Sequence, residues 1–441
     1  MKSVIRTSLL ATVGFASSSA SLSWAQDQGP LAEEVSQRAA KIESKVIAWR
    51  RDIHQHPELS NREVRTSQLV ADHLRSLGLD VKTGVAHTGV VAVLRGGRPG
   101  AVVALRADMD ALPVTEETPV SFASKVRTTY EGKETGIAHV CGHDAHTAIL
   151  MGAAEVLVPM RKELPGSVKF IFQPAEEGPP DGEEGGATLM IKQGVLENPR
   201  PEAIFGLHVT NGYEVGKIAY RPGPAMASAD NFRIVVKGRG THGARPWAGV
   251  DPVVVASQIV LALQTIASRQ VDVTLEPSVI TVASIHGGNR YNIIPDNVEM
   301  TGTIRTYDEA MKKDIHERIR NTAQMIAKSA GAGAEVQIES PYAVTVNDQK
   351  LTARMLPTLR KVAGADNVLL DQKVPAAEDF SYYGQIVPAL YFRLGITPKG
   401  TDPRKTASNH SPRFYVDEAG LLLGVRALTQ LTVDYLQAAG K

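Results

Sequence analysis

The segment AHVCGHDAHTAIL at 138–150 holds residues that are well suited to binding a metal ion. It contains Cys141, the single cysteine of the 441-residue chain, and His143 two positions later. A thiolate and an imidazole at this spacing can face one metal region, and both are good ligands for a borderline-soft divalent ion. An isolated cysteine more often serves as a small core residue. The neighbouring histidines therefore carry the prediction of a metal site.

Three further candidate ligands lie downstream. They are Glu177 in FQPAEEG, His208 in GLHV and His410 in SNHSPRFY. Together with Cys141 and His143 they exceed what one tetrahedral ion needs. Two divalent ions roughly 3.5–4 Å apart, with bridging ligands, fit this set better. Thiolate plus imidazole favours zinc, and manganese, cobalt or nickel stay open because availability often decides the occupant.

The pair Glu176–Glu177 can divide two tasks. Neighbours in an extended segment point in different directions, so Glu177 can bind metal while Glu176 faces the attacking water as a general base. Adjacent glutamates are usually surface residues, and such pairs also occur at 33–34, 116–117 and 183–184. His139 and His146 are either supporting or purely structural. What favours chemistry is the convergence of these residues on one edge of a sheet.

That convergence follows from the predicted elements. Apolar runs such as GVVAVLRG, AVVALRAD, SVKFIFQ and AIFGLHV read as buried strands, and DAHTAILMGAAEVLVPM reads as a helix with Asp144 as its N-cap. This alternation predicts an α/β fold with a mostly parallel sheet covered by helices on both faces. Ligands of such sheets bind beyond the carboxyl ends of the strands. Asp108 and Asp110 follow one strand end there, where they can orient the ligands.

A second domain is predicted from about residue 222. The order of strands and helices there is β-α-β-β-α-β, which is the ferredoxin-like arrangement. One of its helices, DPVVVASQIVLALQTIASR, places Val253, Ala256, Val260, Leu263 and Ala267 on a common face. We expect four segments: a signal peptide at 1–25, a first catalytic part at 26–221, the inserted domain at 222–339 and a second catalytic part at 340–441.

The N-terminus resembles a secretory signal. Lys2 and Arg6 precede a short apolar run, and Ser23 and Ala25 form a small-residue cleavage site. We expect an exported protein, periplasmic or secreted; a lipid-anchored or uncleaved segment is the alternative. The net charge of +1 does not indicate a nucleic-acid partner. We expect no later run to reach the roughly 18 apolar residues of a membrane helix.

Five motifs together resemble the M20 family of metallopeptidases. They are RADMDALP at 106–113, HVCGHDAHTA at 139–148, FQPAEEG at 172–178, GLHV at 206–209 and NHSPRF at 409–414. The similarity is to the amidohydrolase branch, which includes hippurate hydrolases, N-acyl-amino-acid amidohydrolases and auxin-conjugate hydrolases. It covers nearly the whole chain after residue 25, in order. Each motif alone is weak, but the combination is specific.

The resemblance implies roles for particular residues. Cys141, His143, Glu177, His208 and His410 match the metal ligands, Glu176 matches the general base and Asp110 matches the aspartate that orients the site. Asp108 stands where other members carry a metal-binding histidine. In the inserted domain, His242 matches a histidine that reaches the active site of a partner subunit, which implies a homodimer. Asn292 and Arg305 match residues that hold the substrate carboxylate.

The function expected from this resemblance is hydrolysis of N-acyl or N-aroyl amino acids by an enzyme with two divalent ions. A carboxypeptidase or dipeptidase acting on short peptides is the alternative, because a carboxylate clamp serves both. A binding protein on the same fold would have lost ligands or base, and this chain retains both. One departure is the segment GPPDGEEGGATLM after the glutamate pair, which is longer than in the plant enzymes. We expect it to affect the mouth of the pocket.

Overall fold

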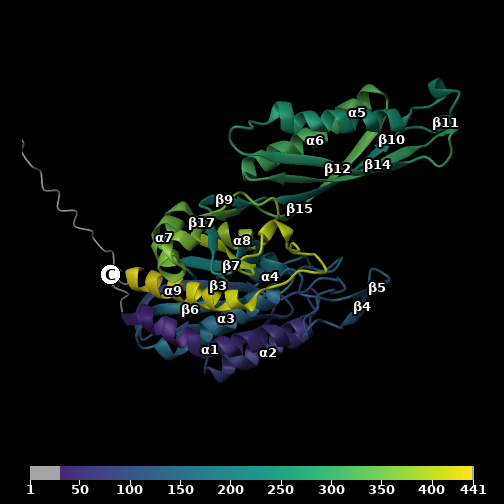
Figure 1. Cartoon of the computed structure of the whole chain (residues 1–441). Coiled ribbons are helices and arrows are strands. Elements are labelled where there is room, and N and C mark those ends of the chain that lie inside the picture. The colour runs from purple at the N-terminus through teal and green to yellow at the C-terminus, as the bar shows by residue number, and fades with distance from the viewer. Residues whose placement is uncertain (1–29, 440–441) are drawn as a thin grey trace, which may run out of the picture.

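The computed structural model describes residues 30–439, and the predicted signal peptide at 1–25 lies outside them. These residues form a larger domain and a smaller one set to one side of it (Figure 1). The smaller domain is a single insertion between two parts of the larger one. The predicted fold class is confirmed: a large, mostly parallel sheet is flanked by helices.

The sheet of the larger domain has the order β1-β2-β6-β3-β7-β18-β8-β17. Its central strands β6, β3, β7 and β18 run parallel, and β1, β2 and β8 join antiparallel to their inner neighbours. The strands are β1 (Asp80–Val85), β2 (Gly89–Arg95), β3 (Arg98–Asp108), β6 (Pro165–Gln173), β7 (Ala203–Glu214), β8 (Ile218–Tyr220), β17 (Val368–Leu370) and β18 (Ala389–Thr397).

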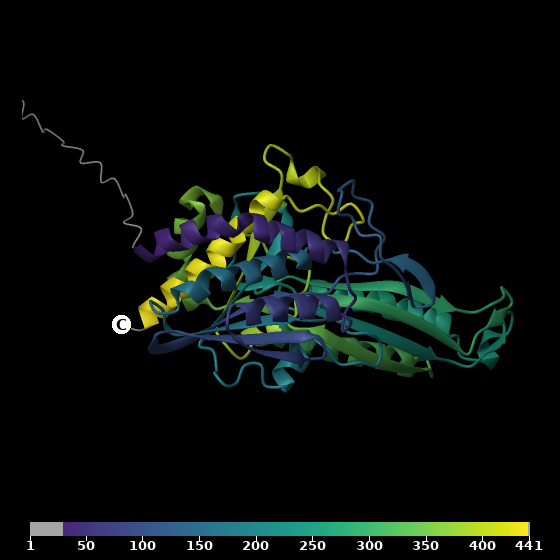
Figure 2. The same cartoon turned by 90° about the horizontal axis from the view of Figure 1, so that it is seen from below.

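Helices cover both faces of this sheet. On one face, α1, α3 and α9 pack side by side, and α2 and α7 extend this layer (Figures 1 and 2). On the other face lie the short helices α4 and α8. The bounds are α1 (Pro30–Gln55), α2 (Val64–Ser76), α3 (His143–Leu157), α4 (Gly186–Lys192), α7 (Gln349–Ala363), α8 (Phe380–Gly384) and α9 (Leu421–Ala439). Because both faces are covered, the central strands are apolar almost throughout.

The smaller domain is a four-stranded antiparallel sheet of order β12-β14-β10-β15 with two helices on one face. Its elements are β10 (Ala229–Lys237), α5 (Pro252–Thr265), β12 (Ser278–Gly287), β14 (Asn297–Thr306), α6 (Glu309–Ser329) and β15 (Gly333–Tyr342). The two helices lie on the side turned away from the larger domain (Figure 1). A separate apolar core between sheet and helices stabilises this domain.

Most of the predicted helical face lies in the core. Ala256 and Leu263 are buried and Val260 and Ala267 pack against the domain core, whereas Val253 is 42% exposed. The helix is apolar almost all round, so periodicity could not exclude Val253 from the buried face. The helical stretch Pro252–Gln270 is also long and apolar enough to cross a membrane by length and composition, contrary to the expectation from the sequence. A third of its residues are buried in the domain core.

Within residues 30–439, further short strands lie outside the two large sheets. They are β4 (Arg127–Tyr130), β5 (Lys133–Gly136), β9 (Gly223–Met226), β11 (Thr241–His242), β13 (Ile293–Ile294) and β16 (Thr345–Asn347). The pair β11–β13 lies at the end of the smaller domain farthest from the larger one (Figures 1 and 2).

Candidate metal centre and active site

The predicted ligands lie beyond the carboxyl ends of neighbouring parallel strands. Asp108 is the last residue of β3 and pairs with Gln173, the last residue of β6, after which the chain reaches Glu176 and Glu177. His208 lies on β7, beside β3. Since carboxyl ends of parallel strands meet at one edge, the topology alone brings these side chains together.

The backbone at Gly142 packs closely against Val209, which explains why a glycine separates Cys141 from His143. The intervening Gly142 has φ of 96°, and a Cβ there would lie 2.3 Å from Cγ2 of Val209. Only glycine fits this close approach in the left-handed region. Helix α3 begins at His143 with Gly142 as its N-cap, so the predicted cap, Asp144, was wrong. The Asp144 carboxylate is instead paired with Arg50 at 2.7 Å.

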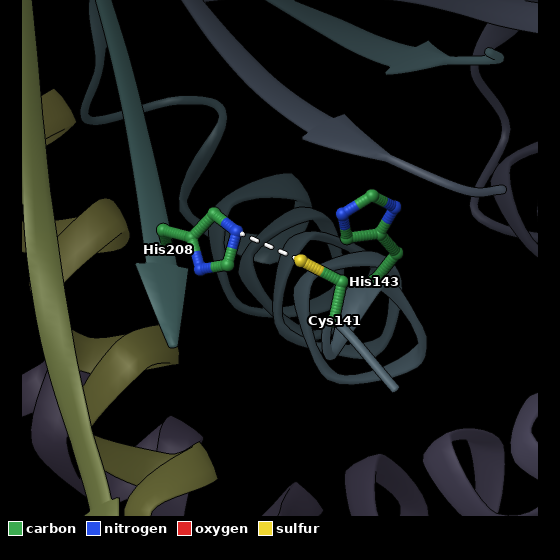
Figure 3. A group of neighbouring side chains, drawn as sticks. All are labelled: Cys141, His143 and His208. Carbon is green, nitrogen blue, oxygen red and sulfur yellow. Dashed lines mark hydrogen bonds between the residues drawn. The ribbon is translucent and has the colours of Figure 1, made fainter. Parts of the chain in front are cut away.

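Cys141 lies at the centre of the cluster (Figure 3). Its Sγ is 3.4 Å from Nε2 of His208 and 3.3 Å from Nε2 of His410. Nε2 of His410 is also 3.0 Å from Oε1 of Glu177. Asn409 donates a hydrogen bond to the Cys141 carbonyl at 3.0 Å. Each of the four other predicted ligands has a donor atom within 4.8 Å of the thiol sulfur.

Glu176 and Glu177 point into different parts of the site. Oε1 of Glu177 faces His410, whereas Oε1 of Glu176 accepts a hydrogen bond from the Asp379 amide at 3.3 Å. Nε2 of His143 lies between them, 3.8 Å from Glu176 Oε2 and 3.9 Å from Glu177 Oε1. The two carboxylates are thus placed for different tasks beside one set of ligands.

Two buried carboxylates hold the turn that carries this pair. Asp110 accepts hydrogen bonds from the amides of Glu176 and Glu177 at 3.1 and 3.0 Å, and Glu63 accepts one from the Ala175 amide at 2.9 Å. Ala175 has φ of 52°, a strained conformation for alanine that these contacts stabilise. Asp110 Oδ1 also lies 3.2 Å from Nδ1 of His143 and so orients that imidazole.

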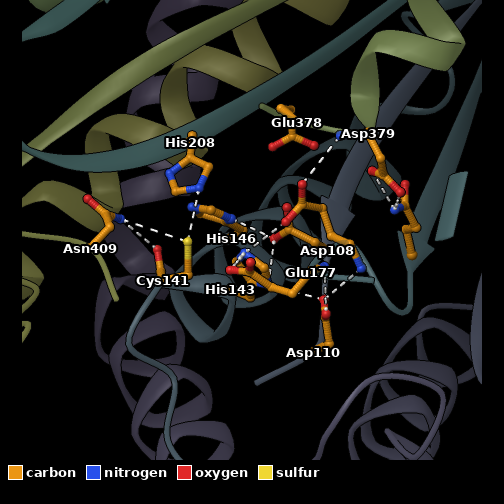
Figure 4. A network of polar contacts seen from close by, with 12 residues as sticks. Asp108, Asp110, Cys141, His143, His146, Glu177, His208, Glu378, Asp379 and Asn409 are labelled. Atoms are coloured by element: carbon orange, nitrogen blue, oxygen red, sulfur yellow. Dashed lines mark hydrogen bonds and ion pairs between the residues drawn. The ribbon is translucent and has the colours of Figure 1, made fainter. Parts of the chain in front are cut away.

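Asp108 belongs to a second buried layer beneath the ligands (Figure 4). It accepts hydrogen bonds from Arg106 and His146, both at 2.6 Å, while His146 Nε2 accepts one from the Val209 amide. The guanidinium of Arg106 is fully buried and also pairs with Glu378 at 3.0 Å and Asp379 at 2.7 Å. With both ring nitrogens occupied, His146 is a supporting residue and not a ligand.

The electrostatics indicate a site built for cations. Burial, followed by the charges of Glu378 and Glu177, raises the pKa of Glu176 well above its usual range. Burial lowers the pKa of His143, but Asp108 and Asp110 outweigh it and raise that pKa to about 10. Burial and then Glu177 raise the pKa of the Cys141 thiol. Without a cation the site thus retains protons, which a divalent ion would displace.

The donor set fits two divalent ions. Cys141, His143 and His208 place one donor atom each within 4.8 Å of one another, as do Cys141, Glu177 and His410. Cys141 is common to both groups, as a ligand shared by two neighbouring ions would be. Among the described residues, the buried Nε2 of His143 has no hydrogen-bond partner, although it faces the ligands. An ion would satisfy it.

A cavity of about 140 Å³ opens beside the cluster. Cys141, His208 and both glutamates line one side of it, and Thr210 and Arg393 continue the polar wall. The remaining wall is mostly apolar and is formed by Val209, Met226, Val374, Ala376 and Ala377. A substrate in this cavity would lie against both the ligands and Glu176.

The predicted residues of the smaller domain lie apart from this cluster. His242, on β11, and Asn292 line a different cavity of about 800 Å³ at the far end of that domain. Arg305, on β14, donates hydrogen bonds to Thr303 Oγ1 at 2.5 Å and to the Ile304 carbonyl at 2.9 Å. A single chain therefore brings together Asp108, Asp110, the five predicted ligands and Glu176. It does not bring His242, Asn292 and Arg305 to that cluster.

Sequence reasoning missed the supporting residues Glu63, Arg106, Glu378, Asp379 and Arg393. Arg106 lies within the RADMDALP motif, where an arginine in an apolar strand was a usable signal for a buried ion pair. The acidic pair in PAAEDF resembled ordinary loop residues. Glu63 sits among charged residues just before a helix, so nothing local distinguished it from the surface.

Comparison with known proteins agrees with this geometry. Residues 104–434 match the model of peptidase family M20/M25/M40. The chain is 41% identical over 407 residues to thermostable carboxypeptidase 2 of Saccharolobus solfataricus, covering 92% of this chain and 99% of that protein. It is 36% identical over 395 residues to N-acetylcysteine deacetylase of Bacillus subtilis, covering 89% and 97%. A crystal structure of a dinuclear metal-binding M20 peptidase from Bacillus subtilis is 33% identical, with a TM-score of 0.75 over 90% of this chain and 99% of that one.

Proposed function

Since the chain belongs to peptidase family M20/M25/M40 and is a metal-dependent hydrolase of amide bonds, we propose that its substrates are N-acyl or N-aroyl amino acids. The products would be a carboxylic acid and a free amino acid. The observation that carries this proposal is the small cavity with one apolar wall that meets the ligands and Glu176. The similarity to a deacetylase of an N-acetylated amino acid supports it.

Cleavage of short peptides by a carboxypeptidase or dipeptidase activity is the second candidate, favoured by the similarity to a carboxypeptidase. The two candidates differ in the free ammonium group of a dipeptide, which an N-acyl amino acid lacks. The cavity wall carries both carboxylates, Glu176 and Glu177, and the guanidinium of Arg393, so its charge alone does not separate them. We place N-acyl amino acids first because of the similarity to a deacetylase, and the substrate panel below decides between the two.

Cys141, His143, Glu177, His208 and His410 would hold the two ions. When bound, divalent ions polarise the substrate carbonyl and lower the pKa of a water molecule. Glu176, whose carboxylate lies among the ligands, takes the proton of the attacking water and returns it to the leaving nitrogen. Zinc fits the thiolate and imidazole donors best; manganese, cobalt and nickel are the other candidates.

We propose that a second copy of the chain completes the site. His242 lies on an exposed pair of short strands far from its own cluster, where it could reach a partner's site and support the developing oxyanion. Exposed apolar residues on the same domain, including Trp247, Leu261 and Tyr291, suit a subunit interface. Asn292 and Arg305 would hold the substrate's α-carboxylate in the assembled dimer.

We also propose that the mature enzyme is exported, because residues 1–25 have the composition of a cleaved signal. Metal binding would then protect the Cys141 thiolate in an oxidising compartment. Cell fractionation with N-terminal sequencing tests this: a processed chain starting near residue 26 outside the cytoplasm is expected, and an unprocessed cytoplasmic chain would contradict it.

A substrate panel tests the proposed reaction. Metal-depleted protein is reloaded with Zn²⁺, Mn²⁺ or Co²⁺ and given hippurate, N-acetyl-methionine and two dipeptides, while released amino acid is measured. We expect metal-restored cleavage of the acylated substrates in preference to the dipeptides. Preferential cleavage of dipeptides would support the peptidase candidate, and no cleavage with any metal would overturn both.

A further inference from the structure

Arg393 lies directly beside a metal ligand. It is on β18, and its register partner on the parallel strand β7 is His208. Register partners on neighbouring strands project from the same face of a sheet, so the two side chains lie next to each other. Both line the cavity of about 140 Å³. A permanent positive charge thus forms part of the wall that substrate must contact.

The guanidinium of Arg393 is fixed before substrate binds. It donates hydrogen bonds to Asp371 Oδ2 at 3.0 Å and to Thr210 Oγ1 at 2.5 Å, and lies 5.7 Å from the centre of the Tyr213 ring. The Tyr213 hydroxyl in turn donates to Asp371 Oδ1 at 2.6 Å. These contacts occupy two of the five N–H donors of an arginine. The others remain for an acceptor in the cavity.

The surroundings select the kind of acceptor. Met226, Val374, Ala376 and Ala377 make the nearby wall apolar. The Asp371 side chain, only 6% exposed, lies behind the guanidinium. A preorganised guanidinium in a half-apolar cavity is matched by a carboxylate, which accepts two parallel hydrogen bonds. A neutral group of the same shape would gain less.

We propose that Arg393 is a specificity-determining residue that binds a second carboxylate on the substrate. This carboxylate belongs either to a dicarboxylic acyl group or to the side chain of an acidic amino acid. The inference rests on the proposed amide hydrolysis and goes beyond it by naming a substrate class. It is separate from the predicted α-carboxylate clamp, because Arg305 lies in the other domain and bonds its own strand.

Two matched substrate pairs distinguish the sources of the carboxylate. N-succinyl-methionine and its terminal amide test the acyl group, and N-acetyl-glutamate and N-acetyl-glutamine test the amino acid side chain. The variants are Arg393→Met, Arg393→Lys and the control Arg404→Met. Arg404 is 89% exposed and pairs with Asp402 in a surface loop. Calorimetry with the zinc-loaded protein measures the affinity for any substrate pair that the enzyme does not cleave. It also compares the affinity for succinate with the affinity for succinamate.

We expect the wild type to prefer the acid in one pair by roughly tenfold to hundredfold in kcat/KM. Arg393→Met should abolish this preference, Arg393→Lys should reduce it and Arg404→Met should keep it. No preference in either pair, or an unchanged preference in Arg393→Met, would overturn the proposal. If the wild type cleaves none of these amides, the proposed function is wrong, but the role of Arg393 is still tested. Tighter binding of succinate than of succinamate, lost in Arg393→Met, would support that role, and equal binding would overturn it.

Discussion

The larger domain buries most of its predicted site residues, whereas His242, in the smaller domain, is exposed. Cys141, His143 and Glu176 are buried and held by hydrogen bonds from the surrounding strands and loops. His242 lies on a short, exposed pair of strands and borders an open cavity of about 800 Å³. A site that works alone must desolvate its groups within one chain. This contrast supports the proposal that the smaller domain contributes to catalysis in a dimer.

The largest effect is expected at the base in the enclosed region. Glu176→Gln removes the proton acceptor and keeps the shape, so kcat should fall roughly 10²–10⁴-fold while metal content is unchanged. Steady-state kinetics and elemental analysis measure both quantities. Glu183→Gln, in the loop after the glutamate pair, is the control and should keep its activity. If the Glu176→Gln protein retained its activity, another residue would have to be the general base.

The next effect tests the exposed region. His242→Ala should lower kcat roughly 10²–10³-fold, because a donor to the oxyanion is lost, and should change neither metal content nor melting temperature. His286→Ala is the matched control, since that histidine is also exposed on the smaller domain. Equal effects of the two substitutions would show that His242 has no special role.

Assembly should depend on the exposed apolar surface of α5. Leu261 is 72% exposed, and Leu261→Glu places a charge on this surface. We expect the dissociation constant of the dimer to rise at least roughly tenfold, with activity falling as monomer accumulates. Light scattering with parallel kinetics measures both. The control is Val64→Glu, because Val64 on α2 is 66% exposed in the larger domain. If the Leu261→Glu protein were monomeric and fully active, catalysis would not require the dimer.

The last effect concerns stability within the enclosed region and leaves catalysis aside. Burial, followed by the charge of Asp110, raises the pKa of Glu63 to about 7 from 4.5. The folded protein therefore holds this proton more tightly than the unfolded chain. Its contribution is full below about pH 4.5 and is lost as the pH rises through about 7.

Glu63→Gln removes this titration. The free energy of unfolding of wild type relative to the variant should fall by at most roughly 1.4 kcal/mol per pH unit across that window. Denaturant unfolding of the metal-free proteins between pH 4.5 and 7.5 measures it. A constant difference between the two proteins over that range would show that Glu63 does not titrate there.

The same contrast explains what the sequence could predict. The ligands lie in short motifs at the ends of apolar strands, so strand order and the geometry of parallel sheets suffice to bring Cys141, Glu177 and His208 together. The supporting layer is different. Glu63, Arg106 and Asp379 come from distant segments that only folding brings together. The local sequences of Glu63 and Asp379 are compatible with the surface, and only Arg106, in an apolar strand, carried a local signal of burial. Their burial is a property of the assembled core.

The smaller domain could be predicted as a ferredoxin-like unit from its order of elements, but not in its relation to the site. Placing Asn292 and Arg305 at the substrate carboxylate requires the orientation of one domain, or one subunit, relative to another. No local pattern encodes that orientation. The exposure of Val253 on α5 could likewise not be predicted from periodicity, because Val253 and Val255 are equally apolar and only packing distinguishes them.

Subunit complementation tests most directly the claim that one chain builds the metal site and a second chain completes it. Metal-loaded Glu176→Gln and His242→Ala proteins, each inactive, are mixed under conditions that exchange subunits. In the mixed dimer, one site pairs an intact Glu176 with an intact His242 from the other chain. We predict that N-acetyl-methionine hydrolysis returns on mixing, approaching one quarter of the wild-type rate. No recovery, with mixed dimers demonstrated by native mass spectrometry, would contradict the account.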